Sequence, residues 1–130
     1  MADPMQVELV AADRVVWSGE ADSVIARTTE GDLGILAGHQ PMLAVLVEGA
    51  VEIGSDGSDN LVAAIDSGFL SVADDRISIL ADEAIMAEDI DVEAARRDLE
   101  EASAADADDE EAAQRARRAQ ARVLAAERVR

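Results

Sequence analysis

The sequence has 130 residues and is strongly acidic, with 29 Asp and Glu against 11 arginines and no lysine, which gives a formal net charge of −18. This charge repels nucleic acid and anionic lipid, and the absence of cysteine excludes disulfides, a thiol nucleophile and a thiolate metal site. No apolar run approaches the roughly 18 residues of a membrane span, and the first residues do not resemble a signal peptide, so we expect a cytosolic protein that does not insert into the membrane.

Up to about residue 85 the pattern is that of a β protein. Met5–Leu9 alternates apolar and polar residues, the period of a half-buried strand. Further runs of this kind are Ser23–Thr29, Ala44–Leu46 continuing through Val51 and Ile53, Leu61–Ile65, Phe69–Val72 and Ile77–Leu80. Turns are predicted between them at Ser18-Gly19, Glu30-Gly31-Asp32, Gly34, Gly38, Gly54–Asn60, Ser67-Gly68 and Asp74-Asp75. Short strands with such frequent turns predict a sandwich or a barrel.

From residue 86 the sequence predicts helices, because it lacks Gly and Pro and is rich in alanine. Asp91 is a suitable N-cap for a helix over about 92–103, and Asp108 with Glu111 resembles a capping box for a second helix over about 109–128. Two helices joined by a short loop form an antiparallel hairpin. Its large apolar residues are few, so we expect the hairpin to be mobile or to depend on what it docks against.

The sequence contains no pattern that predicts catalysis. His39 is the only histidine, so neither a two-histidine metal site nor a Ser-His-Asp triad is expected. The acidic pairs lack the alternating ligand spacing of a calcium-binding loop and are interpreted as turns and helix caps. The segment Gly31–Gly34 matches no phosphate-binding fingerprint and is interpreted as a β-turn. We therefore predict no catalytic residue, no metal and no cofactor.

Charge is unevenly distributed along the chain. Residues 1–111 hold 28 acids and five arginines, whereas residues 112–130 hold six arginines and one acid. Arg115, Arg118 and Arg122 are spaced to form one basic stripe on the second helix, with Arg117 beside it. A solvated surface is one interpretation, and genome composition or salt adaptation would explain the overall bias. The alternative is binding to carboxylates, either of this chain's own acidic body or of a second protein.

Three segments resemble the epsilon subunit of F-type ATP synthase. Residues 31–43 read GDLGILAGHQPML, similar to the family signature G-x-x-G-I-L-P-x-H-x-P-L, with Ala37 in place of the usual proline. Residues 67–72 read SGFLSV, similar to G-G-F-L-x-V, with Ser67 in place of the first glycine. Residues 79–82 read ILAD and are followed at 88–91 by EDID, where the helical part of the family begins. The matches occur in the right order and spacing.

This resemblance implies a β-sandwich over residues 1–85 and a regulatory two-helix hairpin over residues 86–130. The protein would be a non-catalytic central-stalk subunit on the cytoplasmic face of the bacterial plasma membrane, coupling rotation of the c-ring to ATP synthesis. The sandwich would dock on the gamma subunit and the c-ring through the turn from Glu30 to Pro41, with contacts from the side chains of Glu30, Asp32 and His39. The extended hairpin would restrain ATP hydrolysis, its stripe of Arg115, Arg118 and Arg122 meeting acidic segments of the beta subunits.

Two alternatives remain. Some members of the family bind ATP through the motif [I/L]-D-x-x-R-A, and an epsilon-like protein of this kind would sense ATP with its hairpin. Here residues 90–95 read IDVEAA, so Ala94 replaces the arginine of the motif, and Ile85 stands where ATP-binding members have a glutamate. These differences weaken the case for a nucleotide site. The other alternative is a free-standing acidic adaptor protein.

Overall fold

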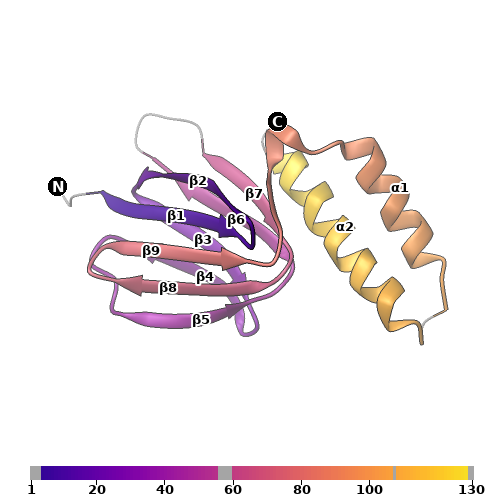
Figure 1. The fold of residues 1–130 in the computed structure, drawn as a ribbon, viewed down its shortest axis with the longest axis horizontal. Helices are drawn as coiled ribbons and strands as arrows, with labels where there is room; N and C mark the ends of the chain where they lie inside the picture. Colours follow the sequence, from indigo (N-terminus) through magenta and orange to yellow (C-terminus); the bar gives the residue numbers. More distant parts are fainter. Residues whose placement is uncertain (1–3, 56–59, 107, 129–130) are drawn as a thin grey trace.

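A computed structural model describes residues 4–55, 60–106 and 108–128. Over these residues the chain forms ten strands followed by a short 3-10 helix and two α-helices (Figure 1). The strands are β1 Met5–Ala11, β2 Arg14–Ala21, β3 Ser23–Thr28, β4 Gly31–Leu36, β5 Met42–Leu46, β6 Gly49–Gly54, β7 Leu61–Ile65, β8 Gly68–Ala73, β9 Arg76–Ala81 and β10 Ala84–Met86. The helices are the 3-10 turn Ala87–Asp89, α1 Val92–Ser103 and α2 Glu110–Arg128.

The strands form one continuous sheet in the order β10-β7-β6-β3-β5-β8-β9-β1-β2, with β4 paired to β3. Strand β3 pairs with β6 over its first half and with β5 at its end, so the sheet turns there from one layer into the other. At the far ends of this order β10 lies against β1 and β2, and the sheet therefore closes into a flattened barrel. The predicted β-sandwich followed by a helical hairpin is confirmed.

The core lies between the two layers and is built from alternating residues of each strand. In β1, Met5, Val7, Leu9 and Ala11 are buried, as the period-two pattern predicts. The largest fully buried side chains include Ile35, Leu46, Ile53, Ile65, Leu70, Ile77 and Ile79. No helix residue belongs to this cluster among the residues that the structure describes, so the sandwich has a core of its own.

The sequence analysis missed β2, β4 and β10. The turn predicted at Ser18-Gly19 is wrong, because both residues lie within β2. Glycine is needed at 19 for packing, since a Cβ there would lie 2.8 Å from the ring of Trp17. The predicted turn at Gly54–Asn60 falls largely on residues 56–59, which lie outside the described part of the chain.

The interpretation of Gly31–Gly34 as a β-turn is also wrong. These residues form most of β4, which pairs along its whole length with β3. The turn lies just before them, at residues 29–30. There the Thr28 hydroxyl accepts a hydrogen bond from the Glu30 amide at 3.0 Å, and donates one to the Gly31 carbonyl at 2.8 Å.

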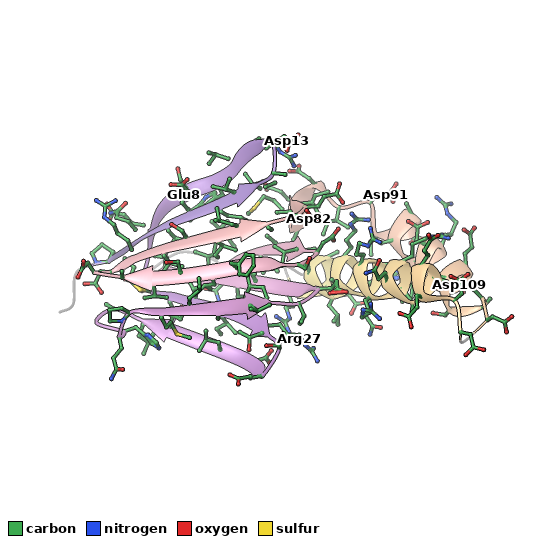
Figure 2. All side chains as sticks on the ribbon, turned by 60° about the horizontal axis from the view of Figure 1, so that its bottom comes forward. Glu8, Asp13, Arg27, Asp82, Asp91 and Asp109 are labelled. Atoms are coloured by element: carbon green, nitrogen blue, oxygen red, sulfur yellow. The ribbon has the colours of Figure 1, made fainter. Side chains whose placement is uncertain are left out.

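The helical hairpin begins at the sandwich and returns to it. Asp91 lies near the sandwich, where its carboxylate caps α1 by accepting a hydrogen bond from the Ala94 amide at 3.1 Å, as predicted. Asp109 lies at the distal tip (Figure 2). It caps α2 in the same way, through the Ala112 amide at 3.1 Å. The cap of α2 is thus Asp109 and not the predicted Asp108, so Glu111 does not stand in the capping-box position.

Helix α2 lies between α1 and the sandwich (Figure 1). Its residues Ala121 and Ala125 are buried against an apolar patch made by Ala50, Val62, Ala64 and Ala87. Towards α1 it buries alanines spaced seven residues apart, at 112, 119 and 126. Both interfaces are therefore close but thin, since an alanine contributes a single methyl group. The predicted mobility of the hairpin stays a prediction.

Neither of the helices in the described residues combines the length and the apolar character that crossing a membrane would require.

Candidate interaction surfaces

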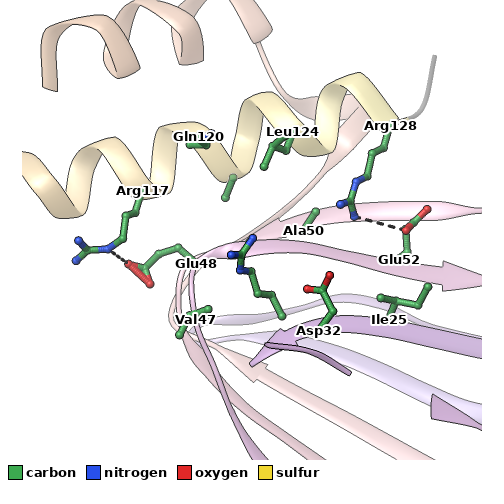
Figure 3. A pocket seen from close by; sticks show the side chains of 13 residues that line it. Ile25, Asp32, Val47, Glu48, Ala50, Glu52, Arg117, Gln120, Leu124 and Arg128 are labelled. Atoms are coloured by element: carbon green, nitrogen blue, oxygen red, sulfur yellow. Dashed lines mark hydrogen bonds and ion pairs between the residues drawn. The ribbon is translucent and has the colours of Figure 1, made fainter. Parts of the chain in front are cut away.

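A groove of about 700 Å³ lies between one side of α2 and the sandwich, next to their apolar contact. Figure 3 shows the side chains that line it. The sandwich side comes from β3, β4, β6 and the loop before β6, and the helix side comes from α2. Apolar lining residues are Ile25, Val47, Ala50, Ala121 and Leu124, and charged ones are Arg27, Asp32, Glu48, Glu52, Arg117 and Arg128. Since acids and arginines are equal in number, the groove is not a strongly charged pocket.

Ion pairs cross this junction at three points in the described part of the chain. The shortest joins Arg117 Nε to Glu48 Oε1 at 2.8 Å, and Glu48 is largely buried, with 16% of its side chain exposed. Arg128 Nη1 lies 3.5 Å from Glu52 Oε2, and a dashed line marks this pair in Figure 3. Arg122 Nη2 lies 3.6 Å from Glu83 Oε2. The hairpin is therefore held to the sandwich by arginine–carboxylate pairs arranged around an alanine contact.

The best-formed pair shifts the pKa of its acid. Partial burial tends to raise the pKa of the Glu48 carboxyl, but the hydrogen bond from Arg117 and the positive charges of Arg117 and Arg118 outweigh it. The pKa of Glu48 therefore lies below its ordinary value. Docking of α2 thus favours the ionised form of Glu48.

Asp66, between β7 and β8, behaves in the opposite way. Its partial burial raises its pKa to about 6, Arg122 and Arg118 act against this rise, and the negative charge of Glu83 adds to it. Asp66 also lines a hollow together with Glu48 and the arginines at 117 and 118. It is thus a half-buried carboxyl at the junction that titrates in the mildly acidic range.

The predicted basic stripe is divided between two neighbours. Arg115 points at α1, with Nη2 at 3.9 Å from Asp98 Oδ1 and 3.6 Å from Glu101 Oε2. Arg122 pairs with the sandwich residue Glu83, and Arg118 lines the hollow next to Asp66. The stripe thus faces the chain's own carboxylates here, one of the two acidic partners considered from the sequence.

The sequence analysis did not single out Arg128, and it placed Arg117 only beside the stripe. The spacing of these arginines could have indicated their role. Residues 117, 121 and 128 lie four and seven positions apart and therefore share one face of the helix. That face, with an alanine at its centre and an arginine on either side, is the one that docks on the sandwich.

The three predicted partner-binding residues do not lie in one turn. Residues 31–36 form β4. Glu30 and Asp32 lie at the end of β4 that is nearer to the helical hairpin, and His39 lies beyond the other end. A six-residue strand separates them by roughly 20 Å. The expectation of a single contacting turn from Glu30 to Pro41 is therefore wrong in its geometry.

Both ends of β4 nevertheless border strand β5. Glu30 and Asp32 line a hollow of about 420 Å³ whose other wall includes Leu43 and Val45 of β5. His39 lies in the loop that leads into β5, and its Nδ1 lies 2.8 Å from the Gln40 carbonyl oxygen. Because a carbonyl oxygen only accepts, Nδ1 carries the hydrogen in this contact.

Strand β5 begins an exposed apolar row that sequence reasoning did not find. Adjacent strands pair in the order Val45 with Phe69, Phe69 with Leu80, Leu80 with Val10, and Val10 with Val15. Val10 is half-buried and the other four are 49% to 58% exposed. The five side chains thus form a line on the outer face of the β5-β8-β9-β1-β2 layer, about 20 Å long at the usual spacing of strands.

The neighbouring row on the same face is mostly polar. It pairs Leu43 with Ser71, Ser71 with Ser78, Ser78 with Glu8, and Glu8 with Ser18. Helix α2 covers β6 and β7 of the other layer, so the described hairpin does not cover the apolar row. Contiguous apolar side chains left in solvent, bordered by polar ones, are typical of a protein–protein contact.

The residues of the ATP-binding motif have other roles in this fold. The Asp91 carboxylate is engaged as the cap of α1, and Ile85 on β10 packs against the apolar cluster under α2. Among the described residues, no group of three or more His, Cys, Asp or Glu is arranged to hold a metal ion.

Known proteins resemble this chain in sequence and in fold. The family described as ATP synthase, Delta/Epsilon chain, beta-sandwich domain, matches residues 4–87. The ATP synthase epsilon chain of Streptomyces avermitilis is 53% identical over 104 residues, which cover 80% of this chain and 84% of that one. The epsilon chain of Rhodococcus opacus is 52% identical over 98 residues, covering 75% and 80%.

Solved structures agree. A chain in the structure of the Euglena gracilis mitochondrial ATP synthase (OSCP, F1 and c-ring) superposes with a TM-score of 0.74 at 28% identity, covering 95% of this chain and 78% of that one. A chain of the central stalk and c-ring of the Tetrahymena thermophila enzyme shares the fold, with a TM-score of 0.62 at 18% identity, covering 98% and 96%. The chain therefore belongs to the delta/epsilon family of ATP synthase subunits, in the branch of the bacterial epsilon chains, which are non-catalytic subunits of the central stalk.

Proposed function

We propose that this protein docks through its sandwich onto the gamma subunit and the c-ring of a bacterial ATP synthase, on the cytoplasmic face of the plasma membrane. It would thereby couple rotation of the ring to ATP synthesis, and its hairpin would restrain ATP hydrolysis. The observation that carries the docking proposal is the exposed apolar row from Val45 to Val15.

The row suits a rigid protein partner. Its members come from five different strands, so the backbone hydrogen bonds of the sheet fix their spacing. Half-exposed Val, Leu and Phe side chains each gain roughly 1 kcal/mol or more when a partner completes their burial. We assign this face, with the adjoining His39 loop, to the gamma subunit. The end of the sandwich with Glu30 and Asp32 is assigned to the c-ring.

The test is binding of the full-length chain to a gamma subunit–c-ring assembly. Leu80→Ser and Val45→Ser should each weaken binding by about fivefold or more, since each removes an apolar contact worth roughly 1 kcal/mol or more. Leu61→Ser is the matched control, because Leu61 is an exposed apolar residue on β7 of the other layer. Equal loss for all three variants, or none, would contradict the assignment of this face.

The proposed restraint of ATP hydrolysis is supported by the arginines of α2, which would pair with carboxylates in both the docked and the extended hairpin. In the docked hairpin Arg122 pairs with Glu83 and Arg115 pairs with acids of α1. Acidic segments of the beta subunits would offer the same chemistry to an extended hairpin. Because one guanidinium cannot occupy both positions, the docked and extended states would compete for these side chains.

Two variants with opposite effects test this competition in the assembled enzyme. Replacing Arg115, Arg118 and Arg122 by alanine removes the stripe, so ATP hydrolysis should be faster, and the difference should shrink as salt rises. Glu83→Gln frees Arg122 without changing the stripe, so the extended state gains and hydrolysis should be slower. If neither variant changes hydrolysis although both are incorporated, the hairpin does not restrain the enzyme.

A further inference from the structure

We propose that Asp75 is a positioning residue for partner binding: its carboxylate fixes the loop of residues 37–41, and thereby the orientation of His39 toward the gamma subunit. This inference rests on the function proposed above. It concerns a turn on the far side of the sandwich from the hairpin.

The contact itself is short and joins distant parts of the chain. The Gly38 amide donates a hydrogen bond to Asp75 Oδ1 at 2.7 Å, across 37 residues of sequence. Hydrogen bonds to a carboxylate are about twice as strong as neutral ones. Gly38 has φ +83°, a conformation that glycine adopts without strain, so the loop reverses direction at the residue that is held.

The turn that carries Asp75 is unusual for its sequence. Asp74 and Asp75 both have positive φ, 52° and 58°, which matches the two central residues of a type I′ hairpin turn. Such turns favour Asn-Gly or Asp-Gly, because a side chain at the second position is strained. An aspartate is tolerated there only at a conformational cost, and in this fold its carboxylate is engaged with the loop.

Asp75 is also a firm anchor. Its own carbonyl accepts a hydrogen bond from the Gln6 amide of β1 at 2.9 Å, and the turn connects β8 and β9 in the middle of their layer. The loop has less support of its own, with a hydrogen bond from the His39 amide to the Leu36 carbonyl at 3.2 Å. The carboxylate therefore ties the five-residue connection between β4 and β5 to a rigid part of the sheet.

The side chains in and beside the loop are suited to contact with a protein partner. Leu36 is 65% exposed at the end of β4, and Leu43, 70% exposed, follows the loop on β5. Between them His39 keeps Nδ1 on the Gln40 carbonyl, so Nε2 remains as an acceptor in the neutral ring. Leu36 and Leu43 are held by strand pairing, whereas His39 depends on the loop, so a change in the loop would misplace His39 relative to the apolar row.

The first measurement is hydrogen exchange of the Gly38 amide by NMR in the full-length chain. Asp75→Gly removes the carboxylate and suits positive φ, so the turn should persist while the Gly38 amide exchanges about tenfold faster. Asp74→Gly is the matched control, with the same change of backbone freedom in the same turn, and should leave the Gly38 amide unchanged. Asp75→Asn keeps an oxygen acceptor and should restore most of the protection.

The second measurement is affinity for the gamma subunit–c-ring assembly. Asp75→Gly should weaken binding by about tenfold, and Asp74→Gly and Asp75→Asn should bind nearly as the unchanged chain does. Unchanged exchange at Gly38 in Asp75→Gly overturns the anchoring. Faster exchange with unchanged affinity overturns the positioning role, while the proposed function still stands if Leu80→Ser weakens binding. Unchanged affinity for Leu80→Ser as well would count against the proposed function itself.

Discussion

Arg117 of α2 donates from Nε to Oε1 of Glu48 at 2.8 Å, and this pair ties the hairpin to the loop before β6. It is the shortest of the ion pairs that cross the junction in the described residues. The apolar contact beside it consists mainly of alanines, so a larger share of the docking energy falls on charge than in an ordinary helix–sheet interface. Docking of the hairpin should therefore depend on ionic strength.

We predict that salt and arginine removal loosen the hairpin in the isolated chain. Exposed ion pairs contribute about 0.2–1 kcal/mol each, so replacing Arg117, Arg122 and Arg128 by alanine should cost roughly 0.6–3 kcal/mol of docking energy. Because the sequence contains no cysteine, spin labels can be attached to cysteines introduced at Ser18 and Glu100. Pulsed electron paramagnetic resonance should show a broader distribution of distances between the two labels in the triple variant. The unchanged chain should show the same broadening at high salt.

The control for that experiment is Arg97→Ala. Arg97 is exposed on α1, and its neighbour Arg96 makes the ion pairs to Glu93 and Glu127. A distance distribution that is narrow and independent of salt in the triple variant would mean that the alanine contact alone holds the hairpin.

Asp66 should make stability depend on pH. Its pKa is 3.8 as a free group and about 6 in the folded chain, because burial disfavours its charged form. A raised folded pKa means that the group's contribution is fully present below pH 3.8 and is lost as pH rises through about 6. As pH rises from 5 to 7.5, the stability of Asp66→Asn should therefore increase relative to that of the unchanged chain. The increase should be roughly 1 kcal/mol after allowance for solvent screening.

Urea denaturation of both chains at several pH values measures this difference. The direction in which this stability difference changes with pH is decisive. If the charge of Arg122 alone determined the pKa of Asp66, that pKa would be lowered, and the unchanged chain would gain stability relative to Asp66→Asn as pH rises. A difference that does not vary with pH would show that Asp66 is solvated in the folded protein.

The predictability of the fold from sequence differed between strands for physical reasons. Strand β1 was found because buried Met5, Val7 and Leu9 alternate with the exposed polar residues Gln6 and Glu8. Strand β2 was missed because its outward face carries Val15 of the apolar row, which removes the alternation. Strand β4 was missed because two of its six residues are glycine, which local rules assign to turns. Local sequence rules thus miss a strand in which apolar residues follow one another, as in β2, or in which glycine occupies strand positions, as in β4.

The candidate surfaces were predictable only in part, because their components are distant in sequence. Helical spacing revealed the arginines of α2, but their carboxylate partners come from three separate segments, at Glu48, Glu52 and Glu83. The apolar row has one member on each of five strands, so only the register of the sheet brings them together. No local pattern could have indicated it.

Gly68, within the second family motif, should tolerate no side chain. A Cβ at this position would lie 1.9 Å from the Leu80 carbonyl oxygen, a backbone atom that cannot move without breaking the β8–β9 pairing. Gly68→Ala should therefore lower the free energy of unfolding by about 3 kcal/mol or more.

Gly34→Ala is the matched control for Gly68→Ala. Gly34 is also a strand glycine, but no atom lies within 4 Å of a Cβ built there, and its φ is not positive. Its stability should change by less than about 0.5 kcal/mol. Equal effects of the two substitutions in thermal denaturation would mean that loss of glycine itself, and not the clash with Leu80, destabilises the strand.

The sandwich should fold without the hairpin. Its core cluster contains no residue of α1 or α2 among those described. Strand β10 completes the sheet at Met86, and the 3-10 turn follows it up to Asp89. A chain truncated after Asp89 would expose the small patch under α2, in which each alanine methyl is worth about 0.8 kcal/mol. It should show a β-type circular dichroism spectrum and a cooperative thermal transition a few degrees lower. A chain truncated after Glu83 lacks β10, which pairs with β7 and buries Ala84, and should be less stable still. If the longer truncated chain is unfolded while the complete chain is folded, the hairpin is part of the core and the two-domain description fails.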